Sequence, residues 1–291
     1  MKATDLPPLP CFLDGEFTVL SEARVSVMDR GFIFGDGVYE VVPLYGGRPF
    51  RFAEHMARLR RSLAAVRIPS PLPPEEWLSV IERLARSLPD ERDLLAYLQV
   101  TRGVALRDHA MPKDIEPTVF AMVSRFNPVP EPARRDGVRC VTAADFRWEK
   151  ANIKSTSLLG SVMARQISVD AGAAETIMFR HGYLSEAAAS NVWIVRGGTV
   201  MGPPPDHLLL EGIRYGLIES LCREAGIAFE LRRISLSEVF RADEVFLSSA
   251  TREVLAVTRL DGQAIGSGRP GPIYDKLYAL YQRAKQSGTP S

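Results

Sequence analysis

Residues 147–166 read RWEKANIKSTSLLGSVMARQ, and they hold two of only six lysines in a chain of 291 residues. The other four lie where an ammonium group is ordinarily solvated, at the chain end, in a Pro-rich turn or on an amphipathic segment: Lys2, Lys113, Lys276 and Lys285. Lys154 differs, because Ile153 and the apolar run that begins at Leu158 flank it. The sequence therefore singles out Lys154 as a candidate for a partly desolvated amine.

Desolvation disfavours the charged form of an amine, which lowers its pKa and makes it a nucleophile. The chemistry that suits a lone lysine of this kind is a Schiff base with a carbonyl cofactor such as pyridoxal phosphate. The alternative is a lysine at the start of a helix that points into solvent. Other parts of the sequence have to favour one or the other.

A pyridoxal phosphate site also needs a partner for the pyridine nitrogen and a binding site for the phosphate. Glu186 is the candidate for the nitrogen, because it ends a predicted strand and precedes small residues that allow close approach. Arg58, on a predicted helix, is one candidate for the phosphate. A second is the helix start in LEGIRYG (210–216), since free backbone N–H groups there bind anions. The SSAT stretch (248–251) offers hydroxyl groups.

Residues 1–126 show the pattern of a small α+β domain. Strand-like runs on either side of Gly46-Gly47 predict a hairpin. Apolar residues spaced by three and four predict an amphipathic helix over 52–66, and a second helix is expected from Pro74. Two buried strands are also predicted, at 94–101 and 118–124.

The stretch NPVPEPARRDG (127–137) has three prolines and no periodicity, which predicts an interdomain linker. Residues 138–291 then alternate short strands with helices, one of them expected at about 156–171. This pattern predicts a larger, barrel-like mixed α/β domain that would carry the cofactor. The fold class expected for the whole chain is α/β, of the α+β type, in two domains.

Composition excludes several other classes of protein. The formal net charge of +1 removes the electrostatic argument for a nucleic-acid partner or a membrane surface. No apolar run approaches the ~18 residues of a membrane helix, and the first residues have no secretory pattern, so a cytoplasmic protein is expected. Three cysteines without CxxC spacing and four histidines without HExxH argue against a metal site.

Two further segments contain candidate substrate-binding residues. RGFIFGDGVYEVV (30–42) lacks the spacing of a nucleotide-binding glycine loop, so a tight turn into a strand explains Gly35 and Gly37 better. Alternation along that strand places Tyr39 on a face that can line a cavity. VTRGVALRDHAMP (100–112) holds Arg107 and His109, which can bind a carboxylate, although a solvated loop is the alternative interpretation.

Taken together, the chain resembles the fold-type IV pyridoxal-phosphate aminotransferases, and most closely the bacterial D-amino acid transaminases. The resemblance runs from about Phe12 to Tyr281 and rests on seven segments in the family's order. These are DRGFIFGDGVYEVV, AEHMARL, VTRGVALRDHAMP, RWEKANIKSTSLLG, SEAAASNVW, LEGIRYG and FLSSATREV.

The resemblance implies a pyridoxal 5'-phosphate enzyme that moves an amino group between a D-amino acid, such as D-alanine or D-glutamate, and a 2-oxo acid such as 2-oxoglutarate or pyruvate, by a ping-pong mechanism. Lys154 would be the Schiff-base lysine and the acid–base group, and Glu186 would face the pyridine nitrogen. Tyr39 would line the substrate pocket. Arg107 and His109 would bind the substrate carboxylate from the neighbouring subunit, so the resemblance also implies a homodimer with shared active sites.

For the phosphate, the resemblance implies Arg58 together with groups from three later segments: Ala189, Ile213, Arg214, Ser249 and Ala250. Here the chain departs from the family pattern. Ala188 and Ala189 stand where the D-amino acid members carry serines, and Arg214 and Ala250 stand where a threonine is usual. Each lost hydrogen bond to a charged group costs about 1.5–3 kcal/mol. One hypothesis is that Arg214 compensates by pairing with the phosphate.

The main alternative within the family is an (R)-amine or branched-chain-amino-acid transaminase. More remote alternatives are a non-catalytic nucleotide-binding module that uses residues 30–37 and a pyridoxal phosphate carrier without turnover. Activity with D-alanine, (R)-phenylethylamine and L-leucine distinguishes the transaminases from one another.

Overall fold

The computed structural model describes residues 5–88 and 92–287, which form two compact units. Unit 1 comprises Met1–Phe126 and Ile153–Leu158, and unit 2 comprises Asn127–Asn152 and Leu159–Ser291. The division after Phe126 lies where the prolines of 127–137 suggested it. The return of Ile153–Leu158 to unit 1 was not expected from the sequence, and it places Lys154 in the smaller unit. None of the helices in the described ranges is both long and apolar enough to span a membrane.

The segment that the sequence suggested as a linker is partly helical. The helix α4 occupies Glu131–Asp136, and Arg134 on it is buried. The Arg134 guanidinium donates from Nη2 to Glu253 Oε2 at 2.9 Å and from Nη1 to the carbonyl oxygen of Val254. A side chain that pairs with a buried carboxylate fixes this segment to unit 2, so residues 127–137 differ from the expected unstructured linker.

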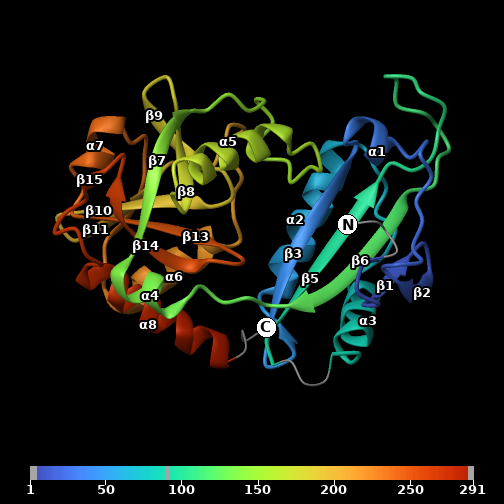
Figure 1. The fold of residues 1–291 in the computed structure, drawn as a ribbon, viewed down its shortest axis with the longest axis horizontal. Coiled ribbons are helices and arrows are strands. Elements are labelled where there is room, and N and C mark those ends of the chain that lie inside the picture. Colours follow the sequence, from blue (N-terminus) through green and yellow to red (C-terminus); the bar gives the residue numbers. More distant parts are fainter. Residues whose placement is uncertain (1–4, 89–91, 288–291) are drawn as a thin grey trace. The chain divides into compact units, whose positions relative to one another are not determined.

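Unit 1 is a six-stranded antiparallel sheet with two longer helices and one short one (Figure 1). The strands lie in the order β2-β1-β6-β5-β3-β4. The predicted hairpin is confirmed, because β3 and β4 pair on either side of Gly46-Gly47, and both glycines have positive φ. The strands and helices are β1 (Pro10–Leu13), β2 (Glu16–Val19), β3 (Gly37–Tyr45), β4 (Arg48–Pro49), β5 (Leu94–Thr101), β6 (Thr118–Arg125), α1 (Arg30–Phe34), α2 (Phe52–Ala65) and α3 (Pro74–Ala85).

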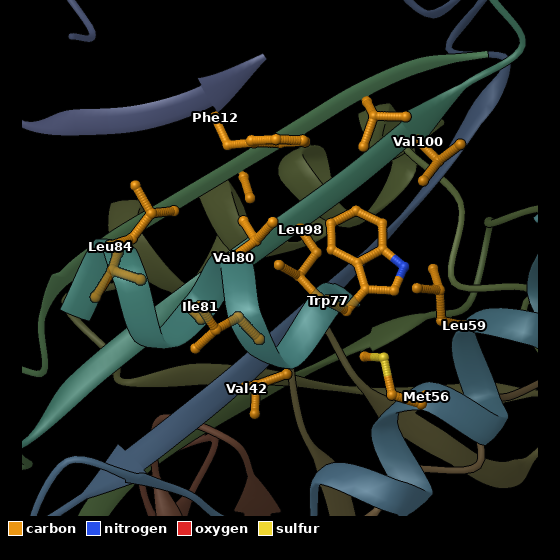
Figure 2. Packing of buried hydrophobic residues seen from close by; sticks show 14 of the residues in the cluster. Phe12, Val42, Met56, Leu59, Trp77, Val80, Ile81, Leu84, Leu98 and Val100 are labelled. Atoms are coloured by element: carbon orange, nitrogen blue, oxygen red, sulfur yellow. The ribbon is translucent and has the colours of Figure 1, made fainter. Parts of the chain in front are cut away.

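The core of unit 1 lies between this sheet and the helices α2 and α3. Figure 2 shows Trp77 and Ile81 of α3 directed at the side chains of the sheet, with Met56 of α2 beside them. The sheet contributes alternate residues of β3 and β5, among them Val42 and Leu98, because successive side chains of a strand point to opposite faces. The opposite face of β3 therefore carries Tyr39.

Unit 2 is built on a nine-stranded mixed sheet in the order β12-β11-β10-β13-β14-β7-β8-β9, with β15 paired to β14. The strands β9 and β10 also contact each other although they are far apart in this order, which shows that the sheet curls. The barrel-like mixed α/β unit expected from the sequence is confirmed. Its elements are β7 (Val138–Ala144), α5 (Leu159–Asp170), β8 (Glu175–Arg180), β9 (Tyr183–Ala187), β10 (Asn191–Arg196), β11 (Thr199–Gly202), α6 (Arg214–Ala225), β12 (Phe229–Leu231), α7 (Leu236–Phe240), β13 (Glu244–Ser249), β14 (Glu253–Leu260), β15 (Gln263–Ala264) and α8 (Pro272–Ser287), in addition to α4.

The packing of α3 gives a direct test of unit 1. Ile81 is fully buried, whereas the next residue, Glu82, is exposed. Ile81→Ala should lower the free energy of unfolding by about 2–5 kcal/mol, because it removes buried methyl groups and leaves a cavity. Glu82→Ala, on the same helix, should change it by no more than about 0.5 kcal/mol. Urea unfolding followed by circular dichroism measures both, and equal losses would contradict the packing described.

Candidate active site

The segment that carries Lys154 is bound to the start of β3 by its backbone. Tyr39 N donates to the carbonyl oxygen of Lys154 at 3.0 Å, and Thr156 N donates to that of Gly37 at 2.9 Å. On its other side, Lys154 N donates to Ser62 Oγ of α2 at 3.2 Å. These bonds hold residues 155–158 outside the helix, so α5 begins at Leu159 and not at the expected Thr156.

The ammonium group of Lys154 lies over an aromatic ring. Its Nζ is 4.0 Å from the ring centroid of Tyr39, a distance at which a cation interacts favourably with the ring face. The Lys154 side chain is half-buried, and within the described residues of unit 1 no carboxylate forms an ion pair with it. Tyr39 in turn stacks on Tyr97 with ring centroids 5.7 Å apart. An amine held by aromatic contacts alone remains available to react.

The glycines of residues 30–37 serve the local backbone. Gly35 caps α1 in a left-handed conformation, with φ of 66°. A Cβ on Gly37 would lie 2.8 Å from the carbonyl oxygen of Val100, so only glycine allows β3 to start this close to β5. Thr156 and Ser157 donate from their hydroxyls to the carbonyl oxygen of Gly35, each at 2.9 Å. This region therefore joins the lysine segment to α1 and β3.

Arg58, the candidate phosphate ligand of unit 1, is held by a buried carboxylate. Its Nε and Nη2 donate to Oε1 and Oε2 of Glu40 at 2.7 and 2.8 Å, and His55 Nδ1 lies 2.8 Å from Glu40 Oε2. All three side chains are buried. Burial by itself would raise the pKa of the Glu40 carboxyl, but the charges and hydrogen bonds of Arg58 and His55 reverse the effect and lower it. Sequence reasoning missed Glu40 and His55.

Arg107 and His109 lie together on one loop. The ring centroids of His109 and of Phe34, the last residue of α1, are 5.4 Å apart. The guanidinium carbon of Arg107 lies 5.5 Å from the Phe34 ring centroid. Arg30 is buried and holds this loop in place, because its Nη1 donates to the carbonyl oxygen of Asp108 at 2.6 Å. Arg107 and His109 are both exposed. A cation and an imidazole on one exposed loop are suited to binding a carboxylate from outside this unit.

In unit 2, Glu186 lies at the end of β9 and is buried. It accepts hydrogen bonds from Arg147 Nη1 at 2.5 Å, Leu210 N at 3.2 Å and Asn191 Nδ2 at 3.3 Å. Burial raises the pKa of the Glu186 carboxyl, and the Arg147 guanidinium opposes that rise. A carboxylate with this set of partners is suited to accepting a further hydrogen bond from a protonated ring nitrogen.

Arg147, which binds Glu186, was missed by the sequence reasoning, although it lies only seven positions before Lys154. Its guanidinium also binds Asp145, with Nε to Oδ1 at 3.0 Å and Nη2 to Oδ2 at 2.9 Å. Arg180 donates to the carbonyl oxygen of Arg147 at 2.8 Å. The sequence held one signal, because the DFR spacing places a carboxylate two residues before the arginine, but a surface pair gives the same pattern.

The candidate phosphate ligands of unit 2 come together where three segments meet. Asn191 at the start of β10 pairs with Ser248 near the end of β13. The Asn191 side chain donates to the carbonyl oxygen of Leu210 at 2.9 Å, and a Cβ on Gly212 would collide with its Oδ1. The loop before β10, the end of β13 and the start of α6 are therefore adjacent, and these three segments are the candidate phosphate cup of unit 2. They carry Ala189, Ile213, Arg214, Ser249 and Ala250.

Two features of this cup fit an anion. The helix α6 begins after Ile213 without a side-chain cap, and a helix start of this kind favours an anion, although Tyr215 N donates to the carbonyl oxygen of Gly212 at 2.9 Å. Ser190 Oγ is buried and has no hydrogen-bond partner. The Arg214 side chain is buried, and its Nε donates to the hydroxyl of Tyr281 on α8 at 3.1 Å. This geometry favours a backbone role for Arg214 over the pairing that was expected to compensate for lost hydroxyls.

The buried pair in unit 1 predicts a pH dependence. The ionised form of Glu40 stabilises the fold above its ordinary pKa of 4.5, and this contribution is lost as the pH falls towards the lowered value. Glu40→Gln leaves Arg58 buried without its counter-charge, so it should cost about 3–5 kcal/mol at pH 7 and less at pH 3. Urea unfolding at both pH values measures this. Glu54→Gln, on α2 with a partly exposed carboxylate, is the control, and a cost for Glu40→Gln that did not vary with pH would contradict the assignment.

The sequence and the fold agree with one family of known proteins. Residues 37–260 match the family described as amino-transferase class IV. Similar proteins include a D-alanine aminotransferase of Bacillus licheniformis, 38% identical over 95% of this chain and 97% of that protein. Another is a D-alanine aminotransferase of Staphylococcus haemolyticus, 33% identical over 95% of this chain and 98% of that protein.

Among solved structures, a branched-chain amino acid aminotransferase of T.th. with pyridoxamine 5'-phosphate superposes with a TM-score of 0.91. It is 25% identical and covers 98% of this chain and 97% of its own. A PLP-bound hypothetical aminotransferase from Mycobacterium tuberculosis has a TM-score of 0.82 and is 25% identical, with 96% of this chain and all of that one covered. This chain belongs to the class IV aminotransferase family.

Proposed function

We propose that this chain is a pyridoxal 5'-phosphate-dependent transaminase that exchanges the amino group of a D-amino acid, such as D-alanine or D-glutamate, with a 2-oxo acid such as pyruvate or 2-oxoglutarate. The observation that carries the proposal is the setting of Lys154, a half-buried amine held against Tyr39 by backbone bonds to β3. The similarity to D-alanine aminotransferases supports the substrate class. The pyridoxamine phosphate and PLP of the solved relatives support the cofactor.

The residues present fit this cofactor in each unit. Lys154 would bind its carbonyl carbon, and Glu186 would hold its pyridine nitrogen. The phosphate would be bound by Arg58 and by groups of the cup in unit 2: Ala189, Ile213, Arg214, Ser249 and Ala250. When bound, the cofactor supplies an electron sink for the charge that develops on the amino acid Cα.

The chain's own residues perform the proton transfers and the positioning. The Lys154 amine would carry the proton between Cα and the cofactor side, which is general acid–base catalysis by one group. Glu186, whose ionised form Arg147 favours, would hold the ring nitrogen in its protonated form. Arg107 and His109 fix the substrate carboxylate. With the carboxylate fixed, the face of Cα that Lys154 addresses decides the stereochemistry.

The position of Arg107 and His109 also supports a homodimer with shared sites. Around their loop lie apolar side chains that are each at least 50% exposed: Val25, Val27, Phe32, Val104, Leu106 and Met111. Asp29 and Val104 form a bridge that joins the two segments on which these side chains lie. An exposed apolar patch of this kind marks a protein–protein interface, and a second copy would bring the loop's two polar side chains to the partner's site.

A branched-chain-amino-acid transaminase is the second candidate, favoured by the superposition on branched-chain enzymes. Sequence identity to the D-alanine aminotransferases is higher, 38% against 25–26%. Arg107 and His109 provide charged donors for a carboxylate, which matches the first proposal. The nucleotide-binding alternative has no further support, since local backbone needs account for Gly35 and Gly37.

Replacing the lysine tests the chemistry. Lys154→Ala should lower kcat with D-alanine and 2-oxoglutarate by at least the about 10²–10⁴-fold that acid–base catalysis contributes. It should also abolish the borohydride-stable adduct that mass spectrometry places on residue 154 of the wild type. Lys150→Ala, at an exposed lysine of the same segment, should retain both properties. An adduct on another lysine would overturn the proposal.

Replacing the arginine tests the substrate class. Arg107→Ala removes charge-assisted hydrogen bonds worth about 1.5–3 kcal/mol, so the KM for D-alanine and for pyruvate should rise about 10- to 100-fold. Turnover of (R)-phenylethylamine, which has no carboxylate, should change much less. Arg223→Ala, at an exposed arginine on α6, serves as the control. Steady-state kinetics with both substrates decide, and an unchanged KM for D-alanine would reject this role for Arg107.

A further inference from the structure

Glu175, at the start of β8, is a fully buried carboxylate that the proposed mechanism does not use. Its Oε1 accepts a hydrogen bond from the backbone N–H of Ala189 at 2.7 Å. Its Oε2 accepts one from Arg252 Nη2 at 3.1 Å. One side chain therefore links the loop before β10 to the turn between β13 and β14.

Both of these segments belong to the cup. Because β10 and β13 are antiparallel and pair Asn191 with Ser248, the residues before β10 and those after β13 lie at the same end of the sheet. Arg252 is fixed in its turn by its own backbone, since Arg252 N donates to Ser249 Oγ at 3.0 Å. Its guanidinium also donates to the carbonyl oxygen of Ala174 at 2.8 Å. The turn cannot shift without breaking these bonds.

The charges around Glu175 explain why it depends on Arg252. A buried carboxylate is costly without a partner of opposite charge, and for Glu175 the compensating groups are Arg252, the Ala189 amide and the charge of Arg165. Arg252 is partly exposed, with 21% of its side chain accessible, so it can be replaced without opening the core. Loss of Arg252 would leave Glu175 to be protonated or to move, and either change would weaken its hydrogen bond with the Ala189 amide.

The cup depends on such bonds more than a hydroxyl-rich cup would. Ala188, Ala189 and Ala250 have no side-chain donors, and the N–H groups of Ala188 and Ala189 already donate to the carbonyl oxygen of Thr176 and to Glu175. On these two loops the phosphate would therefore depend on the Ser190 hydroxyl and on the backbone N–H of Ala250. Backbone donors bind an anion well only when the loops that carry them are held in place. Fixing the loops is therefore the means by which this chain can retain affinity for the phosphate.

We propose that Glu175 and Arg252 form a clasp that holds the two loops in the geometry that binds the cofactor phosphate, and that this clasp sets how slowly the aminated cofactor leaves. The proposal rests on the proposed function, since it concerns the same site. Glu175 and Arg252 are positioning residues, because they act through the backbone of Ala188–Ser190 and Ser249–Arg252.

The experiment measures cofactor release from the holoenzyme. Wild type and variants are converted to the aminated form with D-alanine in the absence of a 2-oxo acid, and free pyridoxamine phosphate is followed by its fluorescence after rapid filtration. Arg252→Met should release it at least about 10-fold faster than the wild type, the effect of losing one hydrogen bond to a charged group. Arg252→Lys, which keeps the charge but not the planar donors, should fall between the two.

The control is Arg232→Met in the same unit. Arg232 is 31% exposed and pairs at 2.9 Å with Glu238, which is itself 22% exposed, and it forms none of the contacts that join the two loops of the cup. The melting temperature of the cofactor-free protein should fall more in Arg252→Met than in Arg232→Met, because Glu175 is fully buried and Glu238 is not. The gap between the melting temperatures with and without cofactor should shrink only in Arg252→Met. Should Arg252→Met fail to fold, Glu175→Gln provides the same comparison.

The outcomes separate the two proposals. Faster release from Arg252→Met, with Arg232→Met unchanged, supports the clasp. Equal release from wild type, Arg252→Met and Arg232→Met, with a borohydride adduct on Lys154 in all three, overturns the clasp and leaves the proposed function intact. A wild type that takes up no cofactor on Lys154 overturns both.

Discussion

The position of Lys154 depends on a segment of six residues that is flanked in the sequence by unit 2 but belongs to unit 1, where it is bonded to β3. Residues 153–158 are held there by backbone bonds at Tyr39 and Thr156 and by hydroxyl bonds to Gly35. These bonds give Lys154 a fixed place beside an aromatic ring. The same segment also explains Gly35, since a Cβ at that position would lie 2.7 Å from Ser157 Oγ.

Three buried carboxylates, found in both units, are each paired with an arginine. Glu40, Glu186 and Glu175 are each buried and each paired with an arginine, namely Arg58, Arg147 and Arg252. A guanidinium is planar, stays charged and offers several donors in a fixed geometry, so it can bind a carboxylate and still reach a second group. Arg147 and Arg252 both do so. Three of the 30 arginines therefore serve to neutralise buried carboxylates.

Much of the fold could be predicted because it follows from local patterns. The hairpin at Gly46-Gly47 and the helices 52–65 and 74–85 have clear periodicity or turn chemistry. The return of 153–158 to unit 1 could not be predicted, because no periodicity records a pairing with residues over a hundred positions earlier. The helix α4 was missed for a related reason, since its stability comes from Arg134 and the distant Glu253.

The candidate site shows the same limit. Lys154 stood out because lysines are rare in this chain and because its neighbours are apolar. Glu40, Arg147 and Glu175 did not, because a charged residue in a sequence is most often solvated, and only the fold shows that the two carboxylates are buried and that 9% of the Arg147 side chain is exposed. Sequence reasoning therefore found groups that would touch the cofactor or substrate and missed those that hold such groups in place.

Similarity of fold and similarity of sequence relate this chain to enzymes named for different substrates, and the structure helps to explain the difference. The fold superposes closely on branched-chain enzymes at 25% identity, whereas the sequence is nearer to D-alanine aminotransferases at 38%. A shared fold requires the same core and the same support for the lysine, but it leaves exposed loops free to differ. Arg107 and His109 lie on such a loop, held by Arg30 and Phe34 and not by the core. If Arg107 and His109 bind the substrate carboxylate, as proposed, substrate choice within this fold can change through that loop while the cofactor chemistry stays the same.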